Sequence, residues 1–186
     1  MSTIISEINW LDVVFLIILL GMIYNGSRAG VGSQLLSLAW WFVLIFFVLN
    51  YYDNVASKVF GFMIQNWARA IAFFLIVTGL MGVIKFLESL FKIERVDDLA
   101  TIERIGGAVM ASLRSFLLFG IIGMQLLLIP IPAIHNAAYK GSKSAMFFVN
   151  VDATIYSYMT RFLAFIDNRE KDQIIGKFIS SPSKKD

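Results

Sequence analysis

The chain has 186 residues, of which 58% are hydrophobic and only 16% are charged, with a formal net charge of +3. An average soluble domain is about half apolar and about a quarter charged, so a soluble fold of this composition would expose a large apolar surface to water. With 17 Phe, 6 Tyr and 4 Trp, the composition also excludes intrinsic disorder. The composition fits a protein whose solvent is lipid.

The residue counts and motifs also exclude several kinds of functional site. The sequence has no Cys and one His, so it offers no disulfide, no thiolate metal site and little for zinc binding or acid–base catalysis. The sequence contains none of the metalloprotease, serine-hydrolase or paired-carboxylate motifs. Its basic residues are scattered, which does not indicate a nucleic-acid partner. We therefore expect no enzyme activity, no cofactor and no metal.

Apolar runs that could cross a bilayer occur four times along the chain. A hydrocarbon core about 30 Å thick needs about 20 apolar residues in a helix. The candidate spans are residues 10–24 (extendable to about 27), 32–52, 67–87 and 105–129. Because lipid cannot satisfy exposed backbone groups, each span must be a helix. The sequence therefore predicts an all-α integral membrane protein, with four transmembrane helices in an up–down bundle over residues 1–132.

The predicted connections differ in character. Residues 25–30 contain Asn, Ser and Gly and predict a tight turn, whereas residues 88–104 form the most charged loop. Pro130 and Pro132 end the fourth span, because proline cannot continue the helical hydrogen bonds. Residues 133–179 are predicted to hold a loop followed by a C-terminal amphipathic helix, and residues 180–186 a polar tail.

The amphipathic helix is predicted from about Asp152 onward, where apolar residues recur at spacings of three and four. The stripe consists of Ile155, Tyr158, Met159, Phe162, Leu163 and Ile166. Such a helix fits the headgroup plane of a membrane or a partner protein. It fits equally well as a helix folded back onto its own bundle, and the sequence leaves this choice open.

The orientation in the membrane is weakly encoded, because the loop charges are nearly balanced. One side carries Arg28, Lys85, Lys92, Arg95 and Arg104, and the other carries Lys58, Arg69, Lys140 and Lys143. The start of the chain has no basic residue ahead of the first span, which favours an outside start under the positive-inside rule. We expect both termini on the outer side.

Arg114 is the most informative polar residue of the spans. It lies near the middle of the fourth span, where an arginine costs roughly 2.5 to 3.5 kcal/mol on insertion scales and normally faces protein or water. Asp12, the one acid well inside a span, is the obvious partner. The pattern predicts an intramembrane pair of Asp12 with Arg114. There are two alternatives: Arg114 lines a water-filled path, or its side chain snorkels to lipid phosphate.

Small residues recur every four positions on the fourth span, at Gly107, Ala111 and Ser115. This spacing makes one smooth helix face on which another helix can approach closely. Gly79 and Gly82 on the third span are similar. Packing within the chain is the simpler interpretation of the Gly107 face, and self-association of two copies is the alternative.

Two segments resemble the colicin V production protein family (CvpA). In the first, residues 29–38, the family's glycine-containing turn and Leu-Ser-Leu are matched by Gly30, Leu36, Ser37 and Leu38, with Gln34 in place of a glutamate. The family's two arginines are replaced by Ala29 and Ser33, although Arg28 lies one place earlier. Asp12 matches the family's aspartate near the start of helix one.

The second segment, residues 103–115, lies at the entry to the fourth span. It matches the family pattern at Arg104, Gly107, Ala108 and Arg114, and Ala111 and Ser115 replace glycines with other small residues. The resemblance covers about residues 8–130. It implies an inner-membrane protein linked to colicin V production or export and to envelope integrity, and it names a process without a biochemical mechanism.

These observations favour a scaffold or accessory component of toxin export over other functions. Its expected partners are membrane lipid, a second copy of the chain, and export or envelope proteins. The alternative is a small oligomeric channel or transporter whose path is lined by Arg114, Asp12 and Ser112. An intramembrane enzyme is a third interpretation, for which no nucleophile and base can be assembled from the sequence.

Overall fold

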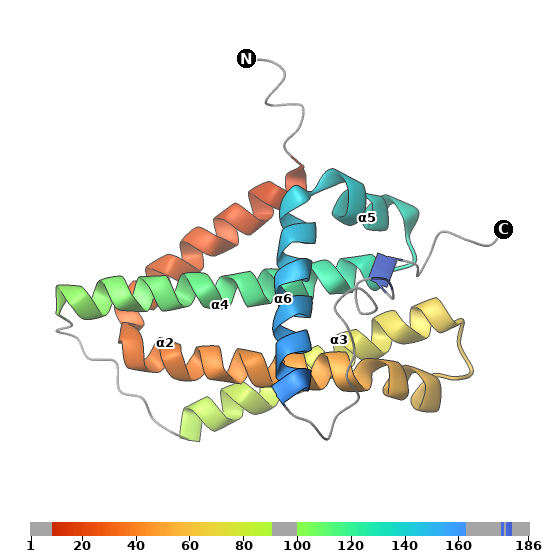
Figure 1. The fold of residues 1–186 in the computed structure, drawn as a ribbon, viewed down its shortest axis with the longest axis horizontal. Helices are drawn as coiled ribbons and strands as arrows, with labels where there is room; N and C mark the ends of the chain where they lie inside the picture. The colour runs from red at the N-terminus through yellow and green to blue at the C-terminus, as the bar shows by residue number, and fades with distance from the viewer. Residues whose placement is uncertain (1–8, 91–99, 163–175, 177, 180–186) are drawn as a thin grey trace, which may run out of the picture.

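The computed structural model describes residues 9–90, 100–162, 176 and 178–179, and the regular elements of this part are all helices. Three are long and apolar enough to cross a membrane: α2 (Trp10–Val59), α3 (Gln65–Leu90) and α4 (Thr101–Leu128). They are followed by α5 (Pro132–Asn136), the π-helical turn η1 (Ala137–Gly141) and α6 (Lys143–Phe162). The prediction of an all-α protein with helices able to span a membrane is confirmed at this level (Figure 1).

Helix α2 is broken at Gly30 into an N-terminal arm, residues 10–29, and a C-terminal arm, residues 31–59. Gly30 has φ 78° and ψ 165°, a left-handed conformation that glycine adopts at little cost. Figure 1 shows the two arms, red and orange, meeting at a sharp corner. The predicted turn over residues 25–30 is confirmed in position but is shorter than predicted, because the backbone stays helical up to Ala29 and breaks at Gly30 alone.

The ends of α3 and α4 agree with the predicted spans to within four residues, whereas the C-terminal arm of α2 runs to Val59, seven residues past the predicted end. α4 ends at Leu128, just before Pro130, and Pro132 begins α5 in the first turn, where its missing N–H removes no helical bond. The loop predicted between residue 133 and the amphipathic helix is wrong, because α5, η1 and the start of α6 occupy this segment. Residues 91–99 of the charged loop and the tail 180–186 lie outside the described residues.

The core lies where α4 packs against both arms of α2 and where α3 covers the C-terminal arm. Its fully buried side chains come from every long helix and include Leu44, Ile45, Val48, Phe73, Met124 and Leu127. The outer faces carry large exposed apolar side chains, among them Ile17 (64% exposed), Phe74 (57%) and Phe86 (63%). Apolar surface on this scale is typical of helices that face lipid.

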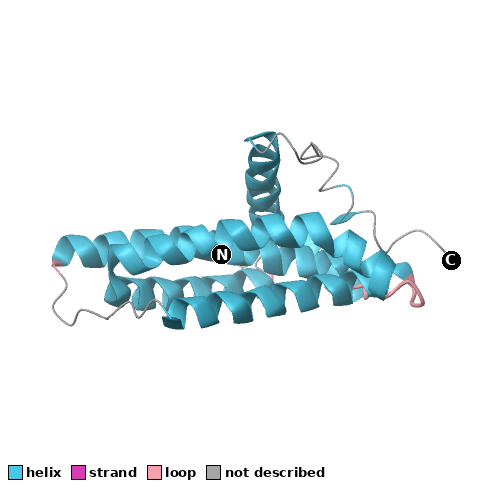
Figure 2. Cartoon of the chain, turned by 90° about the horizontal axis from the view of Figure 1, so that it is seen from below, coloured by secondary structure: helices cyan, strands magenta, loops and turns pink. Residues whose placement is uncertain are grey.

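Helix α6 runs across the long helices, as Figures 1 and 2 both show. Ser142 caps its start, since the Ser142 Oγ accepts a hydrogen bond from the backbone N–H of Ala145 at 3.0 Å. The predicted start at Asp152 is therefore wrong, and the helix begins at Lys143. Of the three environments left open, the structure shows the fold back onto the chain's own bundle.

The side of α6 that packs on the bundle matches the predicted stripe only in part, because Ile155 packs against the core but the fully buried residues are others. Its buried residues are Ala145, Val149, Asp152, Ala153, Tyr156, Ser157 and Thr160. Small residues dominate this side because α6 lies close to Gly120 and Gly123 of α4. Tyr158 of the predicted stripe is 67% exposed. The Phe162 side chain, Leu163 and Ile166 lie outside the described residues.

Candidate functional site

The centre of the α2–α4 contact holds a polar cluster of Gln34, Ser37 and Arg114, hereafter the Arg114 cluster. The Arg114 Nη1 donates a hydrogen bond of 2.8 Å to the Ser37 Oγ. Gln34 lies one turn before Ser37 on the same side of α2, and both are buried. Within the described part of the chain, the Gln34 Oε1 and the Arg114 Nε have no hydrogen-bond partner. The hydrogen bond between Arg114 and Ser37 therefore links the two helices. The Gln34 Oε1 and the Arg114 Nε remain able to accept and to donate a further hydrogen bond.

The predicted pair of Asp12 with Arg114 is absent from the described residues, because each side chain has another partner. The Asp12 Oδ1 accepts a hydrogen bond of 2.5 Å from the Ser142 Oγ. Nearby, the Asn9 Nδ2 donates to the Ala137 carbonyl at 2.8 Å. Asp12 thus lies at the start of two helices, α2 and α6, where helix dipoles favour a negative charge.

The helix register explains why Asp12 and Arg114 do not meet. Gly26 packs on Gly107, and Phe15 stacks on Phe119 with ring centroids 4.7 Å apart, so the N-terminal arm runs antiparallel to α4. This register sets Asp12 beside α4 about seven residues past Arg114, or roughly 10 Å at helical rise. The C-terminal arm runs parallel to α4 instead, and it brings Ser37 level with Arg114.

The small residues of α4 form a close contact with the N-terminal arm of α2. A Cβ added to Gly26 would overlap the Ala111 Cβ and lie 2.7 Å from the Gly107 carbonyl oxygen. A Cβ on Gly107 would overlap the Gly26 carbonyl oxygen and lie 3.2 Å from the Gly30 carbonyl carbon. Ala111 and Ser115 are fully buried on the same side. This face is used within the chain, which is the simpler of the two interpretations that the sequence offered.

The remaining charged motif residues do not join the cluster. Arg28 is near the corner of α2, where its Nη1 donates to the Tyr24 hydroxyl at 3.4 Å and its guanidinium lies over the Tyr24 ring. Arg104 is exposed in the first turn of α4. The structure therefore brings together Gly30, Gln34, Ser37, Gly107 and Arg114, and leaves Arg28, Arg104 and Asp12 elsewhere.

A family model described as Colicin V production protein matches residues 11–153 of this chain. The chain belongs to the colicin V production protein family. The match covers both arms of α2, all of α3, α4, α5 and η1, and the first half of α6. No curated protein and no solved structure matches the chain. Family membership supports a role in toxin production.

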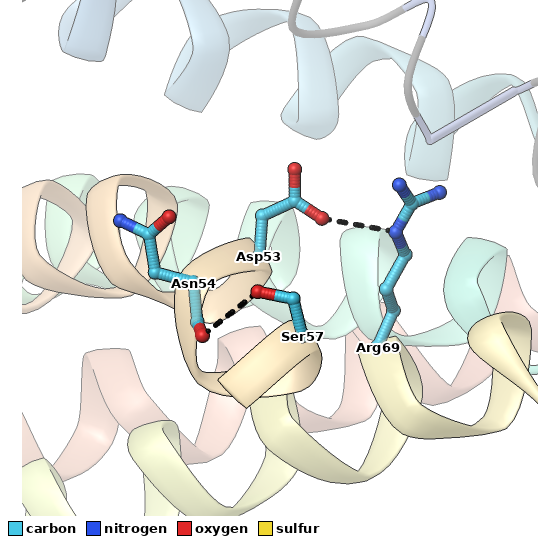
Figure 3. Close-up of polar contacts among 4 residues, drawn as sticks. All are labelled: Asp53, Asn54, Ser57 and Arg69. Carbon is cyan, nitrogen blue, oxygen red and sulfur yellow. Dashed lines mark hydrogen bonds and ion pairs between the residues drawn. The ribbon is translucent and has the colours of Figure 1, made fainter. Parts of the chain in front are cut away.

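In this member of the family, an ion pair that the sequence did not predict links α2 and α3. The Arg69 Nε donates to the Asp53 Oδ1 at 3.0 Å across the turn that joins the two helices (Figure 3). Both side chains are about a quarter exposed. They line a cavity of about 260 Å³ together with Ala56, Ser57, Phe60, Gly61, Met63, Gln65 and Ala68. Because the partners are 16 positions apart in sequence, no helix-spacing rule connects them.

Replacement of Arg69 by alanine is expected to lower the free energy of unfolding by at most about 1 kcal/mol, because a partly exposed ion pair contributes little in water. Chemical unfolding in detergent, followed by tryptophan fluorescence, measures the loss. Arg104→Ala, at an exposed site on α4, is the matched control with no effect. A loss several times larger for Arg69→Ala would show that this ion pair is a main support of the α2–α3 hairpin.

Asp152 is the second feature that the sequence did not reveal. Its side chain is fully buried in α6 against Gly120, and burial raises the pKa of its carboxyl well above the usual range. The apolar periodicity after residue 152 did not predict this burial, because Asp152 is not one of the residues of the predicted stripe. A carboxyl group in an apolar segment, within the family match, was the available indication.

Proposed function

We propose that this chain is a non-enzymatic inner-membrane protein that crosses the membrane four times and acts as a scaffold or accessory component in the production or export of a colicin V-type toxin. Membership of the colicin V production protein family supports the toxin process. The long apolar helices support residence in a membrane. A contribution to envelope integrity, through export or envelope proteins as partners, belongs to the same proposal.

The length of α2 supports four crossings. A helix of 50 residues is about 75 Å long, more than twice the roughly 30 Å of a hydrocarbon core. The break at Gly30 divides it into two arms, each long enough for one crossing. The arms, α3 and α4 then make an up–down arrangement. In this arrangement the N-terminus and the α2–α3 turn lie on one side, which we propose is the outer side.

The observation that carries the scaffold proposal is that the partly buried Arg114 is bonded within the α2–α4 contact. The Arg114 guanidinium is held by Ser37 between two packed helices, and α2 and α4 touch through glycine backbone beside it. The cavity of about 260 Å³ lies at the α2–α3 turn and is lined by neither Arg114 nor Asp12. A structural tie of this kind favours a rigid scaffold over a path lined by these two residues within one chain.

Self-association is proposed to use α3, whose outer face is the most open of the long helices. Only 17% of its most apolar stretch is buried, compared with 39% for α2 and for α4. Gly79 and Gly82 have open space around them. Gly82→Leu is expected to reduce the dimer fraction in native mass spectrometry, whereas Gly21→Leu, at an equally open glycine of α2, leaves it unchanged. Equal dimer fractions for both variants would contradict this surface.

Deletion of the encoding gene in a toxin-producing host tests the proposed function. We expect less active toxin in the medium, with recovery by the wild-type chain. Purified protein in planar bilayers should pass no ions, because the proposed role is structural. Unchanged toxin output would contradict the role in export. A conductance whose selectivity changes in Arg114→Leu would instead support the channel.

A further inference from the structure

Asp152 has an environment that an ionised carboxylate cannot occupy stably. Its side chain is 0% exposed, and neither carboxyl oxygen has a hydrogen-bond partner among the described residues. A methyl group on Gly120 would overlap the carboxyl group, so the acid packs directly on the backbone of α4. Burying an isolated charge carries a far larger desolvation penalty than burying the neutral acid.

Among the residues that the structure describes, the elements packed around Asp152 supply no compensating charge. On α4 the residues from Phe116 to Met124 are uncharged, and the nearest cation of that helix on the N-terminal side of Gly120, Arg114, is six residues or roughly 9 Å away along the helix and bonded to Ser37. On α2 the rings facing α6 are Phe15 and Phe46, which touch Phe148 and Tyr156.

The other titratable groups near α6 lie at its ends or one turn away. At its start are the exposed Lys140 of η1, the exposed Lys143 of α6, and Asp12 of α2, which accepts from Ser142. At the other end Arg161 is exposed, and Tyr156 lies one turn from Asp152. None of these is a cation in contact with the buried carboxyl.

We propose that Asp152 is a proton-binding site inside the bundle, and that α6 is docked on α4 only while this carboxyl is protonated. Ionisation then requires release of α6 from Gly120 and Gly123, which exposes the carboxyl to water. Because α6 is tied at its start by Ser142 to Asp12, release would move its far end. A proton thereby controls which face of α6 is available to a partner or to lipid.

The direction of the pH dependence follows from the raised pKa of Asp152 in the docked state. At a pH below the ordinary carboxyl pKa of about 3.9 both states are protonated and docking is strongest. Above it the released state loses its proton first, so the docked-to-released ratio falls about tenfold per pH unit until the raised pKa is reached. Docking is therefore lost as the pH rises.

The test combines distance and infrared measurements on the full chain in nanodiscs. The chain has no cysteine, so Leu113→Cys on α4 and Tyr158→Cys on α6, both exposed, take two spin labels. As the pH rises, we expect the interspin distance to lengthen with the same midpoint as the loss of the infrared band of a protonated carboxylic acid. Asp152→Asn, which mimics the neutral acid in shape, should keep the short distance throughout.

Two controls assign the infrared band to Asp152. Asp12→Asn should retain the acid band, because Asp12 is a different carboxyl with its own partner. If Asp152→Asn does not fold, the wild-type chain with carboxyl-labelled aspartate reports the same band. An ionised Asp152 in protein whose α6 is docked would overturn the proposal. Release of α6 from Asp152→Asn at the wild-type midpoint would overturn it as well.

Discussion

Gly107→Ala is expected to lower the free energy of unfolding by about 1–3 kcal/mol, the cost of inserting a methyl group into a packed contact. The new Cβ would overlap the Gly26 carbonyl oxygen and approach the Gly30 carbonyl carbon to 3.2 Å. Both neighbours are backbone atoms, which cannot move aside as a flexible side chain does. The N-terminal arm of α2 must therefore shift away from α4.

Gly21→Ala in α2 is the matched control, since there the added Cβ would have no described atom within 4 Å beyond its own stretch of helix. Replacing glycine by alanine within a helix should itself stabilise the chain by about 0.5–1 kcal/mol. Unfolding in mixed micelles, followed by tryptophan fluorescence, compares the two variants. Equal stabilities would show that the two helices are not in contact at Gly26 and Gly107.

A double-mutant cycle on Arg114→Gln and Ser37→Ala is expected to show a coupling free energy of about 1.5–3 kcal/mol, the range of a hydrogen bond to a charged group. The two side chains come from α4 and the C-terminal arm of α2 and are joined at 2.8 Å. Removing either partner leaves the other polar group without its bond in a partly buried site. The double variant should therefore cost less than the sum of the two single variants.

A second double-mutant cycle, on Asp12→Asn and Arg114→Gln, is the control for the first. These residues have separate partners, so their effects on unfolding should add within about 0.3–0.5 kcal/mol. Strong coupling of Arg114 to Asp12, with none to Ser37, would support the Asp12–Arg114 ion pair that the sequence predicts. It would also contradict the register of both arms of α2 against α4.

The sequence predicts the long helices well, because spans in lipid are specified by continuous hydrophobicity. The apolar runs at residues 67–87 and 105–129 lie within or one residue beyond α3 and α4. The spacing of Gly107, Ala111 and Ser115 also indicates a close helix contact, since only small side chains let two backbones approach. The two family motifs contain Gly30 and Gly107, which lie on opposite sides of that contact.

Tertiary partners are harder to predict, because spacing along one helix does not encode the register between helices. The Asn, Ser and Gly of residues 25–30 are typical of turns in water, yet the helix continues to Gly30 because lipid favours internally bonded backbone. Asp12 pairs with Ser142, which lies 130 positions away and belongs to a segment predicted as a loop. The burial of Asp152 depends on how α6 crosses α4, a property of the assembled bundle alone.

Labelling of single cysteines from the two sides of a sealed membrane tests most directly that α2 folds back at Gly30 and crosses twice. Trp10, Phe62 and Ile102 are exposed by 58%, 84% and 82%, and the chain has no native cysteine. With an impermeant maleimide, Trp10→Cys and Phe62→Cys should react from the same side and Ile102→Cys from the opposite side. Reaction of Trp10→Cys and Phe62→Cys from opposite sides would mean that α2 crosses once, and would contradict the account.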